Sequence, residues 1–91
     1  GNAQDLANTV FNLYATNQNY DQQLNQLNSL AQTDPKAFYE ARIGLLGKQM
    51  GWQIGQNTGD RNSVYQNELN SLIPGALASG MTQDQINNLI G

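Results

Sequence analysis

The fold is decided by residues 33–57, which read TDPKAFYEARIGLLGKQMGWQIGQN. Pro35 disfavours helix in the residue before it but suits a first helical position, so a helix should stop near Thr33 and another restart with Asp34 as its N-cap. Apolar residues at helical spacing predict that this second helix runs from Pro35 to about Asn57. Its stripe is Tyr39, Ile43, Leu46, Met50 and Ile54, widened by Phe38, Ala41 and Leu45. Such a wide apolar face predicts a central, mostly buried helix.

Upstream, a heptad seam runs from Ala3 to Ala31 and is interrupted only by Asn17. One long helix is the simplest interpretation, and in it Asn17 would be an a-type residue that fixes register and partner number. The alternative is a break at 17–19, with Asn19 or Asp21 as the N-cap of a second helix, because amide side chains compete for the backbone. The seam comprises Ala3, Leu6, Val10, Leu13, Asn17, Tyr20, Leu24, Leu27 and Ala31.

Downstream of the central helix, glycine and proline divide the chain again. Gly59 is a candidate C-terminal cap, with Asp60 or Asn62 opening the next helix. Pro74-Gly75 is expected to end or bend that helix. Its apolar stripe is Val64, Tyr65, Leu69, Leu72 and Ile73.

The last segment is expected to be a helical corner. Gly80 closes a short turn of helix, and Thr82 is a good N-cap for a final helix that carries Ile86, Leu89 and Ile90. Ala76, Gly80, Ile86 and Leu89 also have the spacing of a DNA-binding helix-turn-helix. However, residues 82–90 contain no Lys or Arg to anchor phosphates, so we expect no nucleic-acid binding.

These elements predict an all-α fold, a small helical bundle of four to six helices built on a long N-terminal helical hairpin. Residues 1–91 form a single helical domain, because a chain of 91 residues has room for one core. No stretch approaches the ~20 apolar residues of a membrane span. Because the chain begins with Gly1 instead of Met, we expect it to be a fragment or mature form of a longer protein.

The amino-acid composition and net charge argue against several classes of function. Cysteine and histidine are absent, which removes thiol nucleophiles, Cys/His metal sites and the commonest general base, so no catalytic, metal or cofactor site is expected. The net charge of −3 repels nucleic acid. Thirteen Asn and twelve Gln accompany only 12% charged residues, and this uncharged polarity suits an extracellular, cell-surface or virion setting.

Gly44, Gly47, Gly51 and Gly55 form the most unusual local feature, because they lie at steps of three, four and four inside the central helix. Each interior glycine costs about 0.8–1 kcal/mol relative to alanine, so the series requires a compensating reason. Close approach of another helix supplies one, either the first helix of the same chain or another subunit. Trp52 lies beside this glycine face and is either an interface anchor or a core residue.

Resemblances to two protein families suggest alternative functions. Glu40, followed by a glycine-rich stretch and Gln53, resembles lytic transglycosylases, in which a helical Glu protonates the glycosidic oxygen. This chain lacks the family's Glu-Ser start and Gly-Leu-Met-Gln pattern, and the simpler interpretation is a solvated Glu40 near Lys36. The heptad helix, the Asp34-Pro35 restart and the second helix resemble the helical hairpin of type III secretion needle subunits over residues 22–46.

The predicted function is therefore a non-enzymatic helical assembly or interaction module of a secreted, surface or virion structure. The glycine face from Gly44 to Gly55 and the seam from Ala3 to Ala31 are its expected contact surfaces, used for a protein partner or for self-association through helix packing. A needle-like filament subunit and a fragment of a peptidoglycan-active enzyme are the alternatives.

Overall fold

The computed structural model describes residues 2–55 and 59–90, with the backbone alone described at residues 2, 52–55 and 59–62. These ranges contain five helices and no strand, which confirms the all-α prediction and the expected helix number. None of the described helices combines the length and hydropathy that a membrane span requires. The helices are α1 (Asn2–Thr16), α2 (Tyr20–Thr33), α3 (Pro35–Gly55), α4 (Gly59–Ala78) and α5 (Gln83–Ile90).

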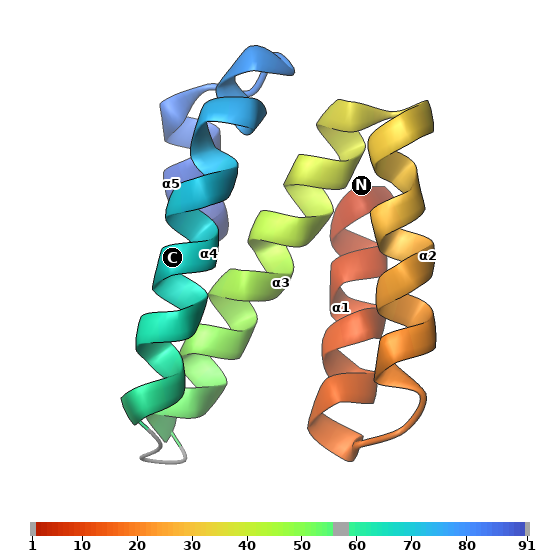
Figure 1. Cartoon of the computed structure of the whole chain (residues 1–91), viewed down its shortest axis with the longest axis vertical. Helices are drawn as coiled ribbons and strands as arrows, with labels where there is room; N and C mark the ends of the chain where they lie inside the picture. Colours follow the sequence, from red (N-terminus) through yellow and green to blue (C-terminus); the bar gives the residue numbers. More distant parts are fainter. Residues whose placement is uncertain (1, 56–58, 91) are drawn as a thin grey trace.

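Helix α3 is the centre of the bundle. It runs obliquely between the antiparallel pair α1 and α2 on one flank and the pair α4 and α5 on the other, as Figure 1 shows. All four other helices contact α3. The prediction of a central, mostly buried helix is thus confirmed.

The core has two parts, one on each side of α3. Ile43, Leu46 and Met50 face α4 and α5, whereas Ala41 and Leu45 face α1 and α2. Steps of three and four place each set on one face, and the two faces together make α3 apolar around most of its circumference. The buried partners are Tyr65, Leu69, Ala76, Met81 and Ile86 on the first side, and Ala7, Val10 and Leu27 on the second.

The N-terminal segment is two helices, so the prediction of one long helix is wrong and the alternative break at 17–19 is confirmed. Asn17 and Asn19 have positive φ angles of 58° and 51°, a backbone conformation that Asn tolerates better than other side-chain-bearing residues. Asn19 holds the N-cap position, although its side chain makes no capping hydrogen bond. The reversal folds α2 back beside α1, and most of the seam residues of both helices then pack in the core against α3. The long N-terminal hairpin is accordingly replaced by a shorter α1–α2 hairpin.

Substitution Asn17→Leu should lower the free energy of unfolding by about 1 kcal/mol, because a branched side chain disfavours the left-handed backbone at this position. Asn17→Gly should leave stability unchanged or raise it, since glycine adopts positive φ freely. Thermal unfolding followed by circular dichroism measures both. A raised midpoint for Asn17→Leu would instead indicate a continuous helix through residue 17.

The Asp34-Pro35 restart is formed as predicted. Pro35 is the first residue of α3, and the Asp34 carboxylate Oδ1 accepts a hydrogen bond from the Ala37 amide at 3.3 Å. The Asp34 amide donates to the Leu30 carbonyl at 2.7 Å and closes the end of α2. One residue therefore ends one helix and caps the next, which fixes the sharp turn between α2 and α3.

The predicted cap at Gly59 and the predicted end of a helix at Pro74-Gly75 are wrong. Gly59 is the first residue of α4 and not the cap of α3, and Pro74-Gly75 lies inside α4, which continues to Ala78. Pro74 removes one helical amide donor, but the packing of α4 on α3 outweighs this loss. Packing explains the glycine at position 75, because a Cβ there would collide with the Tyr39 phenol.

The corner between α4 and α5 confirms the predictions at Gly80 and Thr82. Gly80 has φ 109°, and the Met81 amide donates to the Ala76 carbonyl at 3.1 Å, as in a Schellman motif. Thr82 and Gln85 exchange backbone-to-side-chain hydrogen bonds of 2.9 and 3.1 Å, which is a capping box. This corner turns α5 back onto α3.

Candidate functional site

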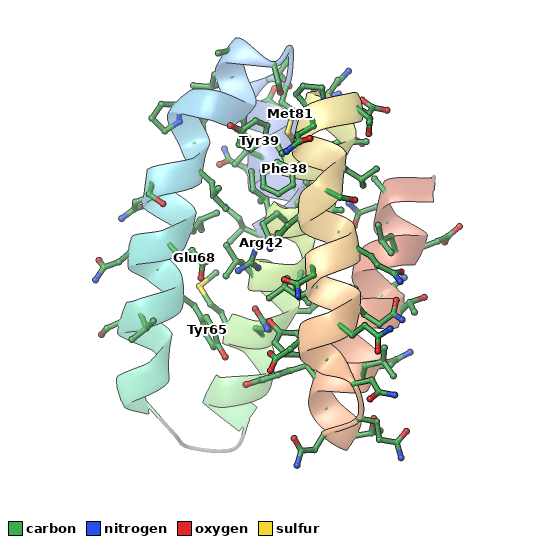
Figure 2. All side chains as sticks on the ribbon, turned by 45° about the vertical axis from the view of Figure 1, so that its right-hand side comes forward. Phe38, Tyr39, Arg42, Tyr65, Glu68 and Met81 are labelled. Carbon is green, nitrogen blue, oxygen red and sulfur yellow. The ribbon has the colours of Figure 1, made fainter. Side chains whose placement is uncertain are left out.

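A buried ion pair joins α3 to α4. Arg42 is 7% exposed, and its Nη2 donates to the Glu68 carboxylate, whose side chain is 39% exposed. The two side chains point toward one another between the helices, with Tyr65 one turn away on α4 (Figure 2). Arg42 Nη1 is buried and has no hydrogen-bond partner among the described residues. A guanidinium so deeply buried depends on Glu68 for charge compensation.

Tyrosine hydroxyls continue this polar layer below the ion pair. The Tyr14 and Tyr65 hydroxyls are 2.9 Å apart and link α1 to α4. Gln49, which is 1% exposed, donates from Nε2 to the Tyr20 hydroxyl at 2.9 Å and links α3 to α2. Tyr65 is therefore a core residue, and the half-buried Tyr14 and Tyr20 join α1 and α2 to this layer.

A cavity of about 260 Å³ lies where α1, α3 and α5 meet, and it is the better candidate for a site. Glu40 is half-buried on α3, and no hydrogen bond or ion pair engages its carboxylate among the described residues. Met81 is 4% exposed and forms part of the apolar wall. The lining residues are Gln4, Glu40, Met81, Gln85, Asn88 and Leu89.

The lining of this cavity contains one carboxyl group. Glycosidases flank the scissile bond with two carboxyl groups, and Glu40 is the only carboxylate among the lining residues. In the part of the chain that the structure describes, no group of three His, Cys, Asp or Glu side chains could hold a metal ion. What the cavity offers is one carboxylate, three amides and two apolar side chains.

The predicted glycine face is not one surface. A Cβ at Gly44 would lie 2.9 Å from the Gln4 side chain of α1, so the expected approach of the first helix occurs there. A Cβ at Gly47 would lie 2.6 Å from the Leu89 carbonyl oxygen, so α5 brings its backbone against this second glycine. Gly51 is exposed, and no atom of a described residue lies within 4 Å of its Cβ position.

Gly55 and the side chain of Trp52 lie outside the residues whose side-chain surroundings are described. Asn17 is exposed in the α1–α2 turn and lines an open hollow there, so its predicted a-type position in a packed seam is wrong. The seam itself is also not free, since Val10 and Leu27 are fully buried in the chain's own core. Of the predicted glycines with described surroundings, Gly51 alone is open to a partner.

Sequence reasoning missed the polar layer and the cavity. Arg42 and Gln49 are polar residues seven positions apart within a helix that is apolar around most of its circumference, and this spacing was the available signal. The cavity had no signal in the sequence, because its lining comes from three helices far apart along the chain.

Comparison with known proteins finds no matching family model, no similar curated protein and no similar solved structure.

Proposed function

We propose that this chain is a non-enzymatic helical assembly module of a secreted, surface or virion structure, and that it self-associates through the exposed part of α3 around Gly51. The observation that carries this proposal is the open space at Gly51. Gly44 and Gly47 on the same helix have packing partners within the chain, whereas Gly51 has none among the described residues.

The physical argument concerns the cost of glycine in a helix. An interior glycine costs about 0.8–1 kcal/mol relative to alanine, and at Gly47 the close approach of the α5 backbone offsets this cost. No described residue offsets it at Gly51, one helical turn further along α3. A second helix that approaches as closely as α5 does at Gly47 would supply the missing compensation.

The alternatives have less support. A peptidoglycan-active enzyme requires a second carboxylate beside Glu40, and the cavity lining contains none. The chain resembles needle subunits in its α2–α3 hairpin, but the break at 17–19 means that it lacks the long first helix on which the resemblance also rested. A filament and a closed oligomer differ in the size of the assembly. Head-to-tail contacts add subunits without limit, whereas a two-fold contact closes at the dimer.

Sedimentation velocity over a range of protein concentrations tests the proposal. The wild-type chain should associate as concentration rises, and Gly51→Leu should shift it to monomer, because a branched side chain would hold two helix backbones apart. The melting temperature of dilute, monomeric protein should not fall, since Gly51 has open space in the monomer.

Lys36→Gln is the matched control, because Lys36 is exposed on α3 but lies fifteen residues before Gly51, about 22 Å along the helix at 1.5 Å per residue. It should leave the association largely intact. A wild-type chain that stays monomeric at all concentrations, or a Gly51→Leu variant that associates as before, would contradict the proposal.

A further inference from the structure

We propose that the cavity between α1, α3 and α5 binds the ε-ammonium group of a lysine from a partner protein. This proposal rests on the proposed role as an interaction module, but it concerns a different surface from Gly51. The cavity of about 260 Å³ has room for one unbranched side chain with a charged end.

The Glu40 carboxylate supplies the charge. The other described glutamate, Glu68, is already paired with Arg42, whereas Glu40 has no partner in the part of the chain that the structure describes. Its half-buried position weakens solvent screening relative to a fully exposed carboxylate. The net charge of −3 favours the approach of a basic partner over an acidic one.

The amides of the lining add oxygen acceptors. Gln4 donates from Nε2 to the Glu40 carbonyl at 3.1 Å, and its Oε1, which lies beside Gly44, accepts no hydrogen bond from a described residue. Asn88 lines the cavity from α5, and none of its side-chain atoms is engaged by a described residue. Gln85 uses its Oε1 to accept from the Thr82 amide, so it contributes no free acceptor. A carboxylate with two amide oxygens matches the three donors of an ammonium group.

The apolar lining suits the stem of a lysine. Met81 and Leu89 form this part of the cavity, and four methylene groups can lie against them while the ammonium reaches Glu40. Arginine fits less well, because its planar guanidinium prefers two parallel bonds to one carboxylate. Lys36 precedes Glu40 by one helical turn, but its stem lies toward the Gly80 turn and it forms no ion pair with Glu40.

Titration of the isotopically labelled chain with Nα-acetyl-lysine methylamide, followed by nuclear magnetic resonance, tests the proposal. The backbone amides of Met81, Gln85, Asn88 and Leu89 should shift in a saturable manner. Nα-acetyl-norleucine methylamide has the same stem without the charge and should bind more weakly. Glu40→Gln should weaken lysine binding about fivefold, the upper range for a partly exposed ion pair.

Asp21→Asn is the matched control for net charge. Asp21 lies beside the α1–α2 turn, at the opposite end of α1 from Gln4, which is roughly 20 Å at 1.5 Å per residue. This variant loses the same charge as Glu40→Gln and should bind the lysine probe as the wild type does. Lys36→Met should bind it more tightly, because a neighbouring cation is removed.

The same titration with Gly51→Leu separates this proposal from the proposed self-association, since a monomer keeps the cavity. Saturable lysine binding that is weakened in Glu40→Gln supports the site even if the wild-type chain never associates. Equal binding of the two probes, no saturable shift, or lysine binding unchanged in Glu40→Gln would overturn the assignment.

Discussion

Glu68→Ala is expected to lower the free energy of unfolding by about 3 kcal/mol, near the lower end for breaking a buried ion pair because the Glu68 side chain is 39% exposed. The variant leaves the Arg42 guanidinium buried at 7% exposure without its counter-charge. A loss of this size is a large part of the 5–15 kcal/mol that stabilises a typical domain. Urea unfolding monitored by circular dichroism measures it.

The double variant Arg42→Met with Glu68→Leu should recover most of the loss. Two apolar side chains avoid the desolvation of both charges, and such replacements are neutral or stabilising in other proteins. The expected difference in the free energy of unfolding has a definite sign, because the double variant must be more stable than Glu68→Ala. A single variant as stable as the wild type would mean that solvent reaches Arg42 and that the pair does not stabilise the junction of α3 with α4.

Gly47→Ala and Gly51→Ala are expected to change stability in opposite directions, although both place the same methyl group on the same helix. At Gly47 the methyl would lie 2.6 Å from the Leu89 carbonyl oxygen, so the backbone of α5 must move. Overpacking of this kind costs about 1–3 kcal/mol. At Gly51 there is open space, and the helix propensity of alanine should add about 0.8–1 kcal/mol.

Urea unfolding of the two variants under conditions where the chain is monomeric tests this pair. Amide hydrogen exchange adds a local measurement, because Gly47→Ala should accelerate exchange in α5, residues 83–90, more than in α1. Equal stabilisation by both substitutions would show that α5 does not hold its backbone against Gly47.

The candidate site shows where prediction from sequence ended. The glycine series was visible in the sequence, and so was its physical meaning as a place of close approach. Which glycine meets which partner was not visible, because Gly44 is covered by α1 and Gly47 by the end of α5, a segment more than forty residues away. Glu40 was also noticed, but its place in a cavity with Gln4 and Asn88 depends on three helices meeting.

The α1–α2 break shows the limit of periodicity. The heptad seam continues through residue 17, since the residues on both sides of the break bury themselves against the same helix, α3. A pattern of apolar positions predicts which residues are buried, but it does not predict whether the chain turns between them. The left-handed backbone at Asn17 and Asn19 is stabilised by the pairing of α1 with α2, which is a tertiary contact.

The amino-acid sequence was sufficient to predict the helical class, the central position of α3, the Asp34-Pro35 restart and the Gly80 and Thr82 corner. These features depend on burial pattern and on hydrogen bonds between near neighbours, both of which are local. Contacts between distant helices were needed to establish that α4 continues through Pro74, that Arg42 pairs with Glu68 and that Gly51 stays open. Each of these is decided by distant helices, because packing free energy outweighs local preference wherever the two compete.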